Sequence, residues 1–179
     1  MSLFARRGAA LSFVATVILA LAACATTDRP PIEGTTPWTS GRLSVRIESD
    51  PAQNVSAGFE LRGTGDSGEL RLNSPLGTRL ATARWTPGSA VLTDSQGEQR
   101  YANLDDLSRR ALGEALPLAA LPDWLAGRPW PQAPHRSNQA GFEQLGWQVA
   151  LTRKAEGFIE ASRAAAPAVM LRVKLDDPS

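Results

Sequence analysis

The chain contains 179 residues with a formal net charge of +1, one cysteine and one histidine. A single cysteine excludes a disulfide or a cysteine-based metal site within the chain, and a single histidine excludes chemistry that needs several imidazoles. Lysine and arginine are scattered singly along the sequence, with no stripe, so the charge pattern does not indicate nucleic-acid binding.

Residues 1–23 predict a lipoprotein signal peptide. Arg6 and Arg7 precede an apolar run over residues 8–23, and small residues stand directly before Cys24. A basic start, an apolar run and a small-residue end are typical of a secretory signal, and the thiol that follows predicts lipidation of Cys24. The alternatives are an ordinary signal peptide with an accidental cysteine and a transmembrane helix, but the run is shorter than the roughly 20 residues of a span.

Residues 24–37 predict a lipidated, flexible tether, because they are polar, rich in Pro and Thr and without an apolar period. Loss of Arg6 and Arg7 with the signal changes the formal net charge from +1 to −1. Ala25 follows Cys24, and the absence of aspartate there favours the outer membrane under the sorting rule of Gram-negative lipoproteins. We expect residues 38–179 to form a single domain at the periplasmic face of that membrane.

The first part of this domain predicts an antiparallel meander. Apolar and polar side chains alternate over residues 42–48, 55–62 and 69–73, which is the period of a half-buried strand. Further strands are expected over residues 78–86, 90–93 and 98–101, and the segments between them are turn sequences such as Pro87-Gly88.

Two short amphipathic helical stretches are expected next. Asn103 is a suitable N-cap for the first, acidic residues follow in its first turn, and Gly113 ends it. Pro117 opens a second stretch that reaches Gly127, and Pro122 is expected to divide it into two pieces.

The remaining residues predict a loop and a return to strands. Residues 128–141 are rich in proline and polar side chains and are expected to form a loop with His135 in solvent. Strands are expected to resume at about Phe142, to turn at Leu145-Gly146, and to continue over residues 147–152, 157–163 and 169–175.

These elements imply a strongly curved antiparallel sheet with helices across one opening. A sheet with one apolar face must close on itself or be covered. Its concave face then either fills with side chains or encloses a pocket. Four inward candidates are small and would leave volume: Ala57, Ala81, Ala83 and Ala90.

Two glycine-rich patterns are better explained as turns than as sites. Residues 63–68 match the spacing of a dinucleotide loop, but that loop must open a helix, and here a strand follows. The same stretch resembles the nucleophile loop of trypsin-like proteases, which needs a base on another strand, and His135 is the sole histidine. The sequence contains no Walker loop and no H-E-x-x-H, so no catalytic residue, metal ligand or cofactor is predicted.

One apolar residue does not fit the strand pattern. Ser74-Pro75-Leu76-Gly77 lies between two strands, and Pro75 and Gly77 fix a turn whose tip presents Leu76. Either Leu76 folds back onto the core, or it is an exposed apolar side chain that enters lipid or meets a partner.

Several short motifs, weak singly but specific in their order and spacing, complete the pattern over the mature chain. They are Gly41-Arg42-Leu43, Ala57-Gly58-Phe59-Glu60, Ser74-Pro75-Leu76-Gly77, Trp85 with Pro87-Gly88, residues 123–129 and Gly146-Trp147. Together with the lipidation signal they resemble the LolB family, the outer-membrane lipoprotein receptors of Gram-negative bacteria. The segment between Pro134 and Trp147 is shorter than the family pattern, which puts one hairpin, and so the strand count, in question.

The resemblance implies an unclosed antiparallel β-barrel of about eleven strands, with an α-helical lid over an apolar cavity. It implies receipt of lipoproteins from the periplasmic carrier LolA and their insertion into the inner leaflet of the outer membrane, without catalysis. The acyl chains would occupy the cavity, Leu76 matches the family's exposed leucine that is important for membrane insertion, and the protein would act as a monomer. The strand alternation suggests these cavity residues: Val45, Phe59, Leu70, Trp85, Leu121, Trp124, Trp147 and Leu171.

Two other classes of protein remain as alternatives. One is a structural or assembly lipoprotein of the outer membrane, with a filled core and no ligand cavity. The other is a lipid hydrolase, which the lack of a Ser/His/Asp set disfavours.

Overall fold

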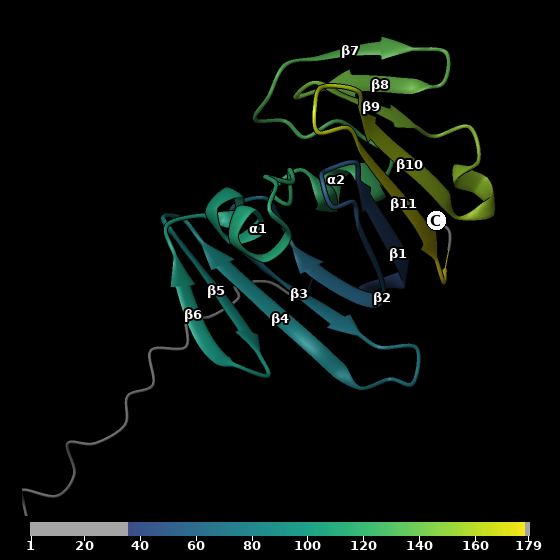
Figure 1. Cartoon of the computed structure of the whole chain (residues 1–179). Coiled ribbons are helices and arrows are strands. Elements are labelled where there is room, and N and C mark those ends of the chain that lie inside the picture. Colours follow the sequence, from purple (N-terminus) through teal and green to yellow (C-terminus); the bar gives the residue numbers. More distant parts are fainter. Residues whose placement is uncertain (1–35, 178–179) are drawn as a thin grey trace, which may run out of the picture. The chain divides into compact units, whose positions relative to one another are not determined.

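A computed structural model describes residues 36–177, which belong to one compact unit. Cys24, the predicted signal peptide and most of the predicted tether lie outside the described residues. Within this part of the chain, eleven antiparallel strands form one sheet in the order β6-β5-β4-β3-β2-β1-β11-β10-β9-β8-β7, with β6 and β7 as its edges (Figure 1). The prediction of a mainly β, unclosed antiparallel barrel is therefore confirmed.

The sheet consists of two meanders that meet at its centre. The first contains β1 (Thr39–Ile47), β2 (Gln53–Gly63), β3 (Gly68–Asn73), β4 (Arg79–Thr86), β5 (Ser89–Asp94) and β6 (Gly97–Tyr101). The second contains β7 (His135–Asn138), β8 (Gly141–Gln144), β9 (Trp147–Ala150), β10 (Phe158–Arg163) and β11 (Val169–Leu175). The first and last strands join the meanders, in a register that runs from Gly41 opposite Leu175 to Ile47 opposite Val169.

The apolar alternation of the strands forms the core. In β1, Leu43, Val45 and Ile47 are buried, whereas Arg42 and Arg46, which point to the other face, are exposed. The two helices lie over the apolar face, where α1 (Leu104–Leu112) contacts β5 and β6, and α2 (Leu121–Leu125) contacts β2 (Figure 1). Among residues 36–177, no helix is both long and apolar enough to cross a bilayer.

Helix α1 has the ends that the sequence predicts. The Asn103 side chain accepts a hydrogen bond of 2.8 Å from the backbone N–H of Asp106, which satisfies a donor that the first turn leaves free. Gly113 ends the helix with a φ of 73°, the left-handed conformation that a C-terminal glycine adopts without strain.

Helix α2 differs from the prediction. The expected helical stretch from Pro117 begins only at Leu121, and Pro122 lies in its first turn instead of dividing it. Proline suits this position, because the N–H that it lacks has no partner in the first turn of a helix. The preceding residues form hydrogen-bonded turns, in which the Ala120 N–H donates to the Pro117 carbonyl at 3.0 Å.

The predicted loop over residues 128–141 is partly wrong. Residues His135–Asn138 form the edge strand β7, which pairs with β8 in a short hairpin, so no hairpin is missing from the sheet. All four residues of β7 are exposed, including His135. A strand with both faces in solvent carries no apolar alternation, which is why the sequence pattern does not reveal it.

Candidate functional site

The concave face of the sheet holds an apolar pocket beneath the helices. Its volume is about 520 Å³, and its wall is contributed by strands of both meanders and by both helices. Ala81 and Ala83 on β4 line it, so two of the small side chains expected to leave volume do lie there, and Ala57 and Ala90 do not. Polar side chains such as Asp94, Gln96 and Gln99 also contribute to the lining.

Six of the eight residues suggested for the cavity line this pocket: Val45, Leu70, Leu121, Trp124, Trp147 and Leu171. Phe59 and Trp85 do not. Phe59 is buried in the core with 2% of its surface exposed. The Trp85 indole N–H donates to the Thr64 carbonyl at 3.0 Å, and its ring lines a second hollow of about 430 Å³ that also contains Trp130.

Several lining residues were not suggested from the sequence. They come from α1 and from the segment between the helices, and they include Leu107, Leu112, Leu116 and Leu118. Leu107 and Leu118 belong to the two stretches expected to be amphipathic helices. An amphipathic pattern indicates packing on the sheet, but it does not indicate which side chains line a pocket. Because the sheet and the helices both contribute apolar side chains, the pocket is an interior space between two layers.

A buried glutamine fixes α2 to the sheet. Gln144 on β8 is 2% exposed, and its carbonyl oxygen accepts hydrogen bonds from the Trp124 indole at 2.8 Å and the Trp130 N–H at 2.9 Å. Its amide nitrogen donates to the carbonyls of Trp130 and Ala133, both at 2.8 Å. The Trp124 ring also packs against Phe142 and Trp147, with centroid distances of 6.3 and 6.1 Å. This part of the pocket wall is therefore held by a fully paired polar group.

The turn between β3 and β4 presents Leu76 to solvent. Leu76 is 95% exposed, more than the other exposed large apolar residues, Trp38, Leu80 and Leu145. The turn is well defined, because the Gly77 N–H donates to the Ser74 carbonyl at 2.9 Å and the Thr78 N–H donates to the Ser74 hydroxyl at 3.1 Å. The alternative in which Leu76 folds back onto the core does not hold.

The outer face of β2, β3 and β4 carries a charge network. The side chain of Glu69 is 1% exposed and accepts hydrogen bonds from Arg62, Arg71 and Arg84 at 2.8, 2.7 and 3.1 Å. Burial alone would raise the pKa of Glu69, but the hydrogen bonds from Arg71 and Arg62 and the charge of Arg84 lower the pKa below its ordinary value of 4.5. The Trp38 ring covers the network, with the guanidinium carbons of Arg62 and Arg71 at 4.5 and 4.2 Å from its centroid.

The glycine-rich patterns have the structures of turns. Gly63 pairs with Gly68 at the end of the β2–β3 hairpin, and β3 follows directly, so no helix N-terminus is available for a pyrophosphate. A Cβ atom at Gly68 would lie 2.5 Å from the Trp85 ring, which explains the glycine by packing. Among the described residues, no cluster of three or more His, Cys, Asp and Glu side chains could hold a metal ion.

The fold and the pocket define a class of protein, the open β-barrels with helices over an apolar pocket. A family model described as outer membrane lipoprotein LolB matches residues 37–175. The outer-membrane lipoprotein LolB of Bordetella petrii is 36% identical over 146 residues, which cover 74% of this chain and 73% of that protein. Two further LolB proteins are similar. That of Ralstonia nicotianae is 35% identical, over 77% of this chain and 68% of that protein. That of Bordetella pertussis is 38% identical, over 63% of this chain and 62% of that protein.

The chain therefore belongs to the LolB family of outer-membrane lipoproteins, which act in lipoprotein localisation and are not a family of enzymes.

Proposed function

We propose that the protein accepts lipoproteins from a periplasmic carrier of the LolA type and inserts them into the inner leaflet of the outer membrane. The observation that carries this proposal is the apolar pocket of about 520 Å³ between the sheet and the helices. Acyl chains are the part of a lipoprotein that such a pocket fits. Membership of the LolB family supports the same role.

The free energy of exposing acyl chains to water explains why a receptor is needed. Each CH₂ group that leaves an apolar environment costs about 0.8 kcal/mol, so three long chains would cost on the order of 30 kcal/mol. Release into water is therefore too slow, and the chains must pass directly from one apolar host to the next. A pocket at the membrane surface provides the last such host before the bilayer, and no nucleotide is required.

We assign the delivery step to Leu76. Its side chain is 95% exposed at the tip of a hydrogen-bonded turn, where a soluble protein gains nothing from an apolar residue. Entry of this leucine into the bilayer would bring the receptor into contact with lipid while the cargo leaves the pocket. Lipidated Cys24 would tether the protein to the periplasmic face of the outer membrane, and the protein would act as a monomer.

The pocket also favours the receptor over the alternative of a structural lipoprotein with a filled core. Interiors of folded domains are close-packed, with few voids larger than a water molecule. An apolar space of this size between a sheet and its helices lowers the stability of the protein unless something occupies it.

Replacement of Leu76 tests the delivery step. In a transfer assay from a soluble carrier, we expect Leu76→Glu to accept a purified lipoprotein as the wild type does but to fail in delivery to liposomes, because a carboxylate does not enter the apolar layer. Leu145→Glu is a matched control, since Leu145 also lies in a hairpin turn and is 47% exposed. Delivery by Leu76→Glu at the wild-type rate would refute the assignment.

Filling the pocket tests the acceptance step. Ala81 lines the pocket, and Ala81→Phe places a ring where an acyl chain would lie. Loss of even two buried CH₂ groups, about 1.6 kcal/mol, lowers the affinity for the cargo by more than about tenfold. The exposed Ala140→Phe is the control, and equal cargo binding by the two variants, measured by retention of lipoprotein on immobilised receptor, would show that the chains bind elsewhere.

A further inference from the structure

The outer face of the sheet contains a second feature, a basic groove of about 630 Å³. Four cationic side chains line it, and Glu160 is the one acidic residue in its lining. The cations are Arg42, Arg153, Arg172 and Lys174. The groove lies on the face opposite the apolar pocket, because Arg42 alternates with the buried Gly41 and Leu43 on β1.

Strand register gathers these charges, which the sequence scatters over more than 100 positions. Arg42 on β1 is the direct partner of Lys174 on β11, and Ser44 is the partner of Arg172. On its other side Arg42 faces Gly58 on β2, which has no side chain to fill the space. A hollow with a positive rim results in a chain whose mature form carries a formal net charge of −1.

The charges of the groove are only partly neutralised. Arg172 pairs with Glu160 at 3.1 Å and Arg153 pairs with Glu156 at 3.0 Å, but these pairs are largely exposed. The Lys174 amine donates to the backbone carbonyl of Glu156, which leaves its charge in place. Arg42 has no ion pair with any residue in the described part of the chain. The groove therefore keeps a surplus of positive charge.

The groove adjoins the Leu76 turn. Ser74 and Pro75 of that turn line it. The register places Asn73, Gly58, Arg42 and Lys174 in one row across four strands, which at about 4.8 Å per strand spans roughly 15 Å. Electrostatic attraction acts over about 10 Å at 0.1 M salt. Arg42 lies two strands from Asn73, about 10 Å away, so headgroups that surround an inserted Leu76 lie within reach of the near end of this row.

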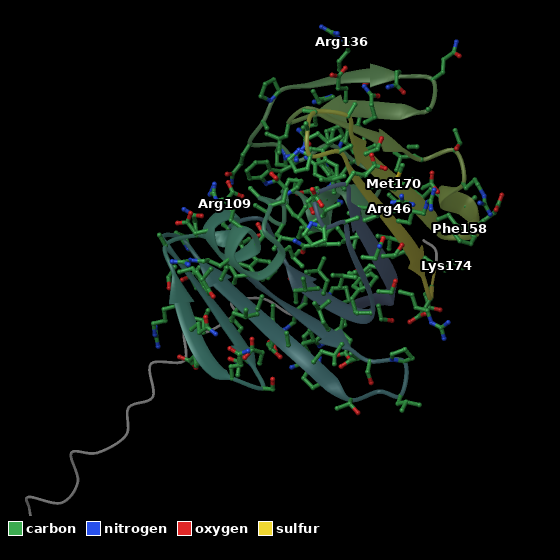
Figure 2. The ribbon with its side chains drawn as sticks, in the orientation of Figure 1. Arg46, Arg109, Arg136, Phe158, Met170 and Lys174 are labelled. Carbon is green, nitrogen blue, oxygen red and sulfur yellow. The ribbon has the colours of Figure 1, made fainter. Side chains whose placement is uncertain are left out.

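An aromatic side chain lies among the cations. The Phe158 ring has the guanidinium carbon of Arg153 at 4.2 Å and the Lys174 amine at 4.7 Å from its centroid. Figure 2 shows Phe158 and Lys174 close together at this end of β10 and β11. An apolar ring flanked by cations can contact acyl chains while the cations face the headgroups, the combination found in elements that lie in the membrane interface.

We propose that this groove binds the phosphate groups of anionic phospholipids in the membrane that Leu76 enters, and so sets the orientation of the receptor on the bilayer. The inference rests on the proposed membrane role of Leu76. Each Lys or Arg near an anionic surface strengthens binding about fivefold, so two charges contribute roughly 25-fold.

Lipoprotein delivery by the lipidated, full mature protein in vesicles tests this inference. One set of vesicles contains phosphatidylcholine alone, and the other also contains phosphatidylglycerol. We expect the wild type to deliver faster to the anionic vesicles and to lose that advantage at high salt. In the double variant Arg42→Gln with Lys174→Gln, we expect the ratio of delivery to anionic vesicles over delivery to neutral vesicles to fall by up to roughly 25-fold, while delivery to neutral vesicles is unchanged.

The control removes the same charge elsewhere. Arg100 lies on the edge strand β6 and Arg136 on the opposite edge strand β7, where Figure 2 shows Arg136 away from Lys174. The double variant Arg100→Gln with Arg136→Gln should keep the anionic advantage. If Arg42→Gln with Lys174→Gln also keeps it, the groove does not bind lipid. If that variant loses delivery equally on both vesicles, the groove serves the carrier or the fold, and the inference is wrong. Normal delivery by Leu76→Glu on both vesicles would instead refute the proposed membrane role of Leu76, on which the inference rests, whatever the charges do.

Discussion

Gln144 should determine whether the wall of the pocket around α2 is stable. In Gln144→Leu, four partners lose their hydrogen bonds: the Trp124 indole N–H, the Trp130 N–H and the carbonyls of Trp130 and Ala133. Each buried polar group without a partner costs about 1–3 kcal/mol. Trp130 is partly exposed, so water can replace the partner of some of these groups. If two groups stay buried without a partner, at about 2 kcal/mol each, the free energy of unfolding falls by about 4 kcal/mol.

Urea denaturation followed by tryptophan fluorescence measures this loss, because the chain contains five tryptophans. With an m value of about 2 kcal/mol/M, the midpoint should fall by about 2 M. Gln144→Glu keeps the shape and the two accepted bonds but sets a carboxylate against two carbonyls, so it should be at least as destabilising.

The control is Gln148→Leu, on the neighbouring strand. Gln148 is exposed and accepts one hydrogen bond of 3.2 Å from Asn138, so its loss should cost less than about 0.5 kcal/mol. If Gln144→Leu and Gln148→Leu unfold at the same urea concentration, the four bonds of Gln144 do not stabilise the fold, and this reasoning fails.

Two further predictions concern the anchor and the outer face. Cys24→Ala should remove the protein from outer-membrane fractions after a carbonate wash, and its retention there would count against the lipid anchor. The lowered pKa values of Glu69 and Glu60 predict that the contribution of these two carboxylates to stability is fully present above the ordinary carboxyl value of 4.5 and is lost as the pH falls through their lower folded values, because the unfolded chain binds protons first. Urea midpoints between pH 7 and pH 3 should show a smaller fall in Glu69→Gln than in the wild type, and parallel curves would exclude the network as the cause.

Much of the sheet could be predicted because burial on one face imposes an alternation that the sequence displays. β1, β2 and β11 lie within three residues of the expected bounds, and the ends of α1 follow from Asn103 and Gly113. β7 could not be predicted, because its four residues are exposed on both faces and therefore show no alternation of apolar and polar side chains. The shift of α2 has a similar origin, since five residues are too few to show a helical period.

The sequence predicts which side chains of one strand face the pocket, but it does not predict which residues the pairing of strands brings together. Alternation indicates that Val45 and Leu171 face inward, and their direct pairing across β1 and β11 then places both in the pocket. The same pairing brings Arg42 to Lys174 on the opposite face, which no local pattern contains. Glu69 lies on the polar face as expected, yet three arginines and the cover of Trp38 bury it, a consequence of the pairing of β2, β3 and β4 that the alternation within one strand does not reveal.

The unclosed sheet makes it possible to separate the two proposed activities by mutation. Its edges are short and polar, with Glu98 and Arg100 on β6 and four exposed residues on β7, which disfavours pairing with another chain. The concave face and the helices enclose the pocket, whereas Leu76 lies in a turn that contributes no residue to the pocket lining. Because a substitution at Leu76 leaves the pocket wall intact and one at Ala81 leaves the turn intact, acceptance and delivery should fail independently. If every substitution abolished acceptance and delivery together, cargo and membrane would have to bind the same surface, whereas in this sheet the pocket and the Leu76 turn are separate surfaces.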